Sequence, residues 1–196
     1  MFTGIIETTG TVLNIEHVQS NMLLYIQSEL TPELKVDQSI AHNGTCLTID
    51  QLSPDWHRCT LIRETLEKTN FGGITVGDIV NLERSVTAQS RIDGHFVQGH
   101  VDGVSICLSV HAMAGSWVYS FSLPSEFKAY VVLKGSICIN GVSLTISELN
   151  KTDFGVSIIP YTYHHTSFKN MKTGDPVNIE YDVLGKYIKR MMDIRG

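Results

Sequence analysis

The feature that most constrains this chain is an internal repeat. When the sequence is shifted by 97 residues, NGTCLTI at 43–49 aligns with NGVSLTI at 140–146. Across the window 39–83, seventeen positions are identical to their counterparts in 136–180, and the alignment needs no gap. Self-similarity over such a length indicates a duplicated domain rather than a short solenoid unit.

The two halves begin at a slightly different spacing, because FTGII at 2–6 aligns with VQGHV at 97–101. We therefore predict an N-terminal domain over 1–96, a C-terminal domain over 97–185 and a separate tail over 186–196. Each half is long enough to bury a small core of its own.

Most segments of both halves have the character of strands. They are short, rich in β-branched and aromatic residues, and bounded by Gly, Pro, Asn, Asp or Ser. They are GTVLNIEHV at 10–18, MLLYIQS at 22–28, HRCTLIRET at 57–65, DIVNLERS at 78–85, SWVYSFSL at 116–123, FGVSIIPYT at 154–162 and PVNIEYDV at 176–183. Short helices are expected over 32–35 and 125–135. Many short strands at even spacing predict an all-β chain of two closed barrels, and closure removes unpaired edge strands.

The tail has a different pattern. Apolar side chains recur there at helical spacing, at Leu184, Tyr187, Ile188, Met191 and Met192. This amphipathic helix has no counterpart in the repeat, and its apolar stripe needs a surface to cover it. That surface is either the helix's own barrel or other copies of the chain.

Composition excludes several classes of protein. A net charge of −5 argues against a nucleic-acid binder, which usually carries a basic excess. No apolar run is long enough to span a membrane, and the first residues lack the pattern of a secretory leader. The four cysteines form no CxxC pair, so we expect reduced thiols in the cytoplasm, with Cys59, Cys107 and Cys138 acting as buried hydrophobic residues.

Metal and phosphate sites lack their usual patterns. His95 and His100 would point to opposite faces of a strand, and the adjacent His164 and His165 diverge, so we expect no metal site. The glycine-rich phosphate loops and the HExxH motif are missing from the sequence.

The duplicated NGxxLT motif is the strongest candidate for a functional element. On a strand, Cys46 and Thr48 share a face, as do Ser143 and Thr145. These side chains either line a polar pocket in each half or only follow a turn and bond to backbone. The halves differ where Cys46 aligns with Ser143 and where residue 5 aligns with His100, which indicates different tasks for the two halves. A histidine suits proton transfer near neutral pH.

These stretches resemble the riboflavin synthase family over nearly the whole chain and in the expected order. They are MFTGIIE, SIAHNGTCLTI, RETLEKTNFG, VGDIVNLERS, GHFVQGHVDG, KGSICINGVSLTI and VNIEYDVLGKYIKRM. The resemblance implies two six-stranded Greek-key barrels and a C-terminal helix through which three chains associate. It also implies that the protein is cytoplasmic. An association with lumazine synthase is a further expectation from the resemblance.

The activity that the resemblance implies is a transfer between two identical substrates. One 6,7-dimethyl-8-ribityllumazine donates a four-carbon unit to a second, which yields riboflavin and 5-amino-6-ribitylamino-2,4(1H,3H)-pyrimidinedione. This transferase reaction is the last step of riboflavin biosynthesis and needs no metal or organic cofactor. The competing class is a non-catalytic antenna protein that binds a lumazine or flavin. The presence of both NGxxLT copies, together with Ser39, Cys46, His100 and Thr145, favours the enzyme.

The resemblance also implies where the two substrates bind. They stack at a subunit interface, one held by the N-terminal barrel of one chain and the other by the C-terminal barrel of its neighbour. The N-terminal pocket would use Gly4, Ile5, Ile6, Cys46, Leu47, Thr48, Thr60, Leu61, Ile62, Arg63, Glu64 and Thr65. The C-terminal pocket would use Gly99, His100, Val101, Lys134, Ser143, Leu144, Thr145, Ile159, Pro160, Tyr161, Thr162, Tyr163 and His164.

Individual roles follow from the same resemblance. We expect His100, supported by Thr145, to handle the proton of the acidic C7-methyl group. Ser39, Cys46 or water would add at C7 of the other lumazine. Phe2 would close the N-terminal pocket, while Ser143 and Asp182 would supply polar groups to the second one. Tyr161 and His164 depart from the family pattern, so we expect backbone rather than side-chain contacts there.

Overall fold

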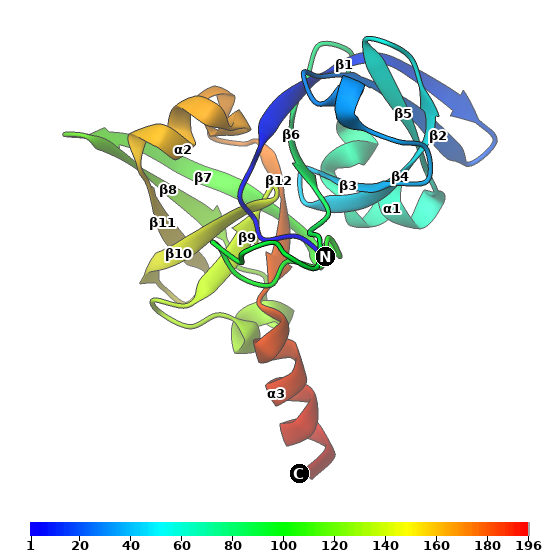
Figure 1. The fold of residues 1–196 in the computed structure, drawn as a ribbon. Helices are drawn as coiled ribbons and strands as arrows, with labels where there is room; N and C mark the ends of the chain where they lie inside the picture. Colours follow the sequence, from blue (N-terminus) through cyan, green and yellow to red (C-terminus); the bar gives the residue numbers. More distant parts are fainter. Residues whose placement is uncertain (196) are drawn as a thin grey trace.

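The computed structural model describes residues 1–195 and contains two closed six-stranded antiparallel barrels in tandem, followed by a helix (Figure 1). The all-β prediction with two barrels is confirmed. The strands of the first barrel are β1 (Thr8–Val18), β2 (Asn21–Gln27), β3 (Ser39–His42), β4 (Thr45–Leu52), β5 (Trp56–Leu61) and β6 (Ile79–Arg84). Those of the second are β7 (Gly103–Met113), β8 (Ser116–Ser122), β9 (Ser136–Ile139), β10 (Val142–Leu149), β11 (Asp153–Ile158) and β12 (Pro176–Tyr181).

Both barrels have the same Greek-key topology. Around the first barrel the order is β1-β2-β5-β4-β3-β6, and the second repeats it as β7-β8-β11-β10-β9-β12. Strands β3, β4 and β5 are consecutive neighbours, and β6 returns through a long connection to lie beside β3. That connection contains α1 (Arg63–Lys68) and the 3-10 helix η2 (Asn70–Gly73). Its counterpart contains α2 (Pro160–His165) and η4 (Ser167–Asn170).

The strands close into barrels with the help of β-bulges at matching places. The pairing of β1 with β2 shifts between Val12 and Asn14, and that of β7 with β8 shifts between Cys107 and Ser109. Strands β4 and β10 each carry an equivalent bulge after the NGxxLT motif. A bulge bends its strand and increases the local twist, which a barrel of short strands requires.

Two strands end earlier than the sequence predicts. Strand β5 stops at Leu61 and β11 stops at Ile158, and the residues after them form α1 and α2. Pro160 lies at the start of α2, where its missing N–H costs no hydrogen bond. The helices expected over 32–35 and 125–135 are short 3-10 turns, η1 (Thr31–Glu33) and η3 (Ser125–Tyr130).

Each barrel encloses its own apolar core, made of the inward-facing side chains of its six strands. Cys59, Cys107 and Cys138 are buried, as expected, and all four cysteines are free thiols. No helix within residues 1–195 combines the length and the apolar character that crossing a membrane requires.

The C-terminal helix α3 (Val183–Arg195) projects away from both barrels (Figure 1). Near its start it contacts the second half of the chain, where Lys186 forms an ion pair of 2.6 Å with Asp102. The apolar stripe is left open, with Tyr187 67% and Met192 67% exposed. The alternative in which this stripe packs on its own barrel is therefore wrong. Gly196, the last residue of the predicted tail, lies outside the described residues.

Candidate functional site

The two Asn-Gly turns of the NGxxLT motif meet at the junction between the barrels. Asn43 and Gly44 have φ values of 44° and 77°, and Asn140 and Gly141 have 46° and 84°. Two consecutive residues at positive φ are typical of a tight hairpin turn, for which Asn-Gly is the preferred pair. A Cβ atom on Gly44 would lie 2.7 Å from the backbone nitrogen of Gly141. The first two residues of the motif therefore serve the close approach of the halves.

A buried asparagine network crosses this junction with twofold pseudosymmetry. Asn81 Nδ2 donates to the carbonyl of Asn140 at 2.8 Å, and Asn178 Nδ2 donates to the carbonyl of Asn43 at 2.9 Å. The backbone nitrogens of Asn81 and Asn178 in turn donate to the side chains of Asn43 and Asn140. Each half thus satisfies buried backbone groups of the other.

The last part of the motif presents polar groups on the outside of each barrel. Ile40 and Leu47 point into the first core, so Ser39, Cys46 and Thr48 lie on the outer face of the β3–β4 hairpin. Ser143 and Thr145 occupy the equivalent outer face of the β9–β10 hairpin. The predicted sharing of a face by Cys46 with Thr48, and by Ser143 with Thr145, agrees with this arrangement.

Each outer face is completed by a segment that leads into the opposite half. The backbone nitrogen of Ser143 donates to the carbonyl of Gly4 at 2.8 Å. The backbone nitrogen of Cys46 donates to the carbonyl of Gly99 at 2.9 Å. The assignment of Gly4 to the N-terminal site and of Gly99 to the C-terminal site is therefore wrong, because the two segments are exchanged. The repeat in the sequence shows that the two segments correspond to each other. It does not show which barrel each segment contacts.

Two buried glutamates anchor the exchanged segments. Each glutamate belongs to one barrel and holds the segment that packs on the outer face of the other barrel. Glu83 on β6 accepts hydrogen bonds from the backbone nitrogens of Thr3 and Gly4, at 2.7 and 3.0 Å. Glu180 on β12 accepts from those of Gln98 at 2.7 Å, Gly99 at 2.9 Å and His100 at 3.0 Å. Burial raises the pKa of both carboxyl groups, and the backbone donors oppose that rise. Sequence reasoning missed these residues, although their identity in the repeat was a signal.

Phe2 lies between the halves rather than over the N-terminal site. Its backbone pairs with Val97, and its side chain is 1% exposed in a small cluster with Ala41, Val97 and Cys138, next to Cys46. The prediction that Phe2 closes a pocket is not met in the single chain, because the ring is sealed in the seam between the barrels.

The outer face of the second barrel carries a polar pair that the sequence did not reveal. His95 Nδ1 lies 2.7 Å from Ser143 Oγ, and both side chains are partly buried. Burial lowers the pKa of His95, and the nearby charge of Asp182 opposes that shift. Asp182 also accepts a hydrogen bond from the backbone of Leu184 at the start of α3. The equivalent of Ser143 in the first half is Cys46, which packs against Gly99 and Phe2 instead.

The remaining predicted residues do not all lie on these faces, since Leu61 is buried in the core of the first barrel. His100 is exposed next to Gly99, and no hydrogen bond within residues 1–195 joins it to Thr145. Ile62 and Ile159 are 53% and 60% exposed where β5 and β11 end. A further group of these residues lies at the end of β5, on α1 and on α2. They are Thr60, Leu61, Arg63, Glu64 and Thr65 in the first half and Pro160, Tyr161, Thr162, Tyr163 and His164 in the second.

Two cavities lie elsewhere on the molecule. One of about 350 Å³ lies at the junction of the halves, lined by Asn43, Asn140 and residues of η2 and η4. Another of about 440 Å³ lies at the end of the first barrel, beside Thr8 and Gln27. Neither is lined by Cys46, His100, Ser143 or Thr145. The two cavities therefore do not coincide with the candidate faces.

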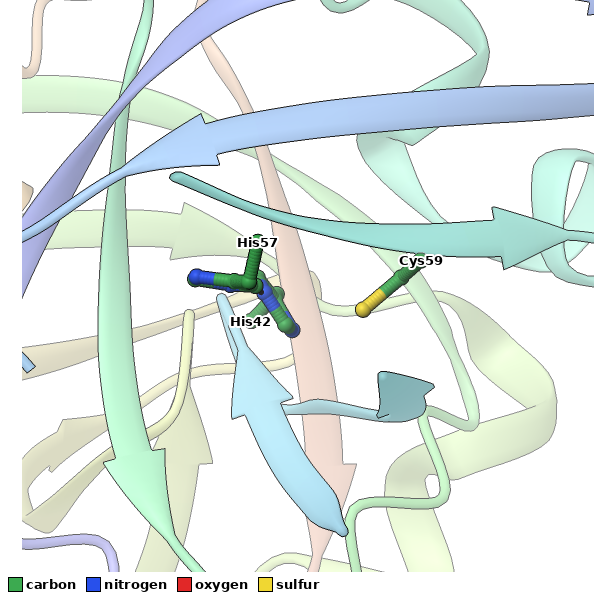
Figure 2. Close-up of side chains that lie close together, drawn as sticks. All are labelled: His42, His57 and Cys59. Atoms are coloured by element: carbon green, nitrogen blue, oxygen red, sulfur yellow. Dashed lines mark hydrogen bonds between the residues drawn. The ribbon is translucent and has the colours of Figure 1, made fainter. Parts of the chain in front are cut away.

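A cluster of possible metal ligands lies in the core of the first barrel. Figure 2 shows the sulfur of Cys59 directed toward the imidazoles of His42 and His57. The Nε2 atoms of the two histidines are 2.8 Å apart, which is a hydrogen-bond distance. Two zinc–nitrogen bonds at a tetrahedral angle would separate these atoms by about 3.3 Å. The pair therefore fits a shared proton better than a metal ion, and burial lowers the pKa of both histidines.

Two closed barrels of one topology, with equivalent outer faces, make this a protein of two tandem copies of one domain. The family model described as "Lumazine binding domain" matches residues 3–85 and again 98–182. The chain is 40% identical over 193 residues to the riboflavin synthase of Bacillus amyloliquefaciens, covering 98% of this chain and 90% of that protein. It is 39% identical over 206 residues to the riboflavin synthase of Mycobacterium bovis, with full coverage of both. The chain belongs to the riboflavin synthase family.

The fold is also similar to that of a solved structure, LumP complexed with riboflavin. The two superpose with a TM-score of 0.87 at 22% sequence identity, over 92% of this chain and 99% of the other. At this level of identity the similarity shows the shared fold and nothing further.

Proposed function

We propose that this protein is a riboflavin synthase, a transferase that moves a four-carbon unit between two molecules of 6,7-dimethyl-8-ribityllumazine. The observation that carries the proposal is the pair of equivalent but chemically unequal outer faces. One presents the Cys46 thiol beside Gly99, and the other presents the Ser143 hydroxyl bonded to His95. Two copies of one substrate that play donor and acceptor need similar binding sites with different reactive groups.

His100 and the candidate nucleophiles Ser39 and Cys46 lie on the face that Gly99 completes, whereas Ser143 and His95 lie on the other face. One lumazine loses a proton from its C7-methyl group, whose carbanion is stabilised by the ring, and exposed His100 is the base that we assign to this step. At C7 of the other lumazine a nucleophile adds, and Ser39, Cys46 or water fills that role. Ser143, held by His95, is a hydrogen-bond partner of the bound substrate, and Asp182 supports His95 electrostatically. Holding the two rings face to face contributes to the rate through proximity.

The assembly that we propose is a trimer joined through α3. Thr48, His100 and Thr145 on these faces are exposed in the single chain, so we expect a second chain to cover a bound lumazine. Residues that cover it include Thr48 and Ile62 on one chain and Thr145 and Ile159 on its neighbour. The exposed stripe of α3, with Ile188 and Met191 59% and 55% exposed, is the surface that brings chains together.

Two further assignments extend the proposal. A cytoplasmic location is supported by four free cysteines, three of them buried without a disulfide. An association with lumazine synthase, which would supply the substrate, remains a prediction from the family resemblance.

The direct test is optical. The purified protein is incubated with 6,7-dimethyl-8-ribityllumazine, and riboflavin is followed by its absorbance and identified by chromatography. Formation of one riboflavin per two lumazines consumed is expected. Tight binding of the lumazine without product would show an antenna protein instead and would refute the enzyme.

A further inference from the structure

Glu180 lies in one barrel and holds a segment that completes the outer face of the other. Its carboxylate is 2% exposed and accepts three backbone hydrogen bonds from the consecutive residues Gln98, Gly99 and His100. Hydrogen bonds to an ionised group are roughly twice as strong as neutral ones, so this carboxylate fixes the segment firmly.

The segment that Glu180 holds is packed directly on Cys46. The carbonyl of Gly99 accepts the hydrogen bond from the backbone nitrogen of Cys46 at 2.9 Å. A Cβ atom on Gly99 would lie 2.6 Å from Cβ of Cys46, so the backbone there lies against the cysteine with no spare room. Gly99 has φ +82°, a conformation that the hydrogen bonds must maintain.

Glu180 is therefore linked through one short loop to two groups of the proposed reaction. It binds the amide of His100 directly, and it reaches Cys46 through Gly99. It is also linked to the C-terminal helix, because the Lys186 ammonium group, paired with Asp102 at 2.6 Å, lies close enough to favour its ionised form.

We propose that Glu180 is a positioning residue that sets the relative placement of His100 and Cys46 across the junction of the two halves. The effect of Glu180 on catalysis rests on the proposed function. Its effect on the position of the loop at Gly99 does not. Glu83 performs the equivalent task for Gly4 and Ser143, and it provides a matched comparison from the same chain.

The test compares Glu180→Gln with Glu83→Gln. The carboxamide keeps the size of the side chain but turns one acceptor oxygen into an NH2 group that faces backbone N–H donors. Circular dichroism and thermal unfolding establish that both variants are folded. If Glu180→Gln does not fold, Glu180→Asp is used, because it keeps the charge but shortens the reach to the loop.

The first readout does not depend on any enzymatic activity. Cys46 is the only cysteine of the four that is not buried. Its alkylation by iodoacetamide is followed by peptide mass spectrometry. We expect the Glu180 variant to be alkylated at Cys46 at least tenfold faster than the unmodified protein, and the Glu83 variant at an unchanged rate. Equal rates in all three folded proteins would overturn the proposal.

The second readout is the division of the effect between kcat and KM for the lumazine. Because the loop orients groups that react, Glu180→Gln should lower kcat at least tenfold and change KM less than threefold. A rise in KM alone would also overturn the positioning role. If the unmodified protein shows no turnover, the proposed function fails, while the alkylation experiment still decides the role of Glu180.

Discussion

Gly44 and Gly141 face each other across the junction so closely that neither can carry a side chain. A Cβ atom on Gly44 would lie 2.7 Å from the nitrogen of Gly141, and one on Gly141 would lie 2.8 Å from the nitrogen of Gly44. The Asn-Gly pair of each motif thus belongs to the contact between the barrels, while the polar residues that follow it belong to the outer faces.

We predict that Gly44→Ala lowers the free energy of unfolding by about 2–4 kcal/mol, because it combines positive-φ strain with a backbone collision. Gly77→Ala is the matched control. Gly77 also has a positive φ, of 94°, but its added Cβ would meet nothing within 4 Å. The control should cost about 1–2 kcal/mol in urea unfolding. Equal losses in the two variants would mean that the contact with Gly141 adds nothing to stability.

The hydrogen-bonded pair His42–His57 makes the stability of the first barrel depend on pH. Burial lowers the pKa of His57 from 6.5 to about 4 in the folded protein, so the unfolded chain binds more protons between these values. The stabilising contribution of the neutral pair is complete above pH 6.5 and is lost as the pH falls toward 4. At pH 5 the loss is about 2 kcal/mol for His57, and burial of His42 adds a loss in the same direction.

The double variant His42→Ile with His57→Phe installs the residues that the second barrel has at the equivalent positions, Ile139 and Phe154. Urea unfolding at pH 7.5 and at pH 5 should show a smaller pH dependence in this variant than in the unmodified protein. The contributions of Glu83 and Glu180 are common to both proteins and cancel. An unchanged pH dependence would exclude the pair as its source.

The exposed stripe of α3 predicts that assembly depends on Ile188. Ile188→Glu places a charge at the centre of the stripe and should yield monomers in sedimentation equilibrium, with turnover reduced at least tenfold at micromolar concentration. Arg190→Glu changes a charge on another side of the same helix and should leave the assembly intact. A trimeric Ile188 variant would require another interface.

The proton-transfer role of His100 predicts a specific kinetic defect. His100→Ala should lower kcat by about 100-fold, within the usual range for removal of a general base. Binding of riboflavin, followed by the quenching of its fluorescence, should change little, because the loop is held through the backbone of His100. Full turnover with unchanged binding would assign the proton to another group.

Much of this architecture was predictable from the repeat. The similarity of residues 43–49 to 140–146 implies two barrels of one topology, and the spacing of Leu184 and Ile188 implies the final helix. The exchange of the segments at Gly4 and Gly99 was not predictable, because the alignment of two copies carries no information about which copy each segment touches. That choice depends on contacts such as Ser143 to Gly4, made by residues 139 positions apart.

The candidate site was predictable only as a set of residues. Cys46, Thr48, Ser143 and Thr145 lie on the faces that alternation on a strand requires. His95 was missed as a functional residue because its partner, Ser143, lies 48 positions away and its own segment is not a strand. Glu83 and Glu180 were missed because a charged residue near the end of a strand is ordinarily placed in solvent.

The anchoring of the segment at Gly99 by Glu180 orders events during synthesis of the chain. The first barrel has all its strands once Arg84 has left the ribosome, but Glu180 emerges 96 residues later. At about 5–20 residues per second, the nascent chain spends about 5–20 s with a closed barrel whose outer face at Cys46 is still uncovered. Functional maturation of the N-terminal half therefore waits until β12, the last strand of the second barrel, has been translated.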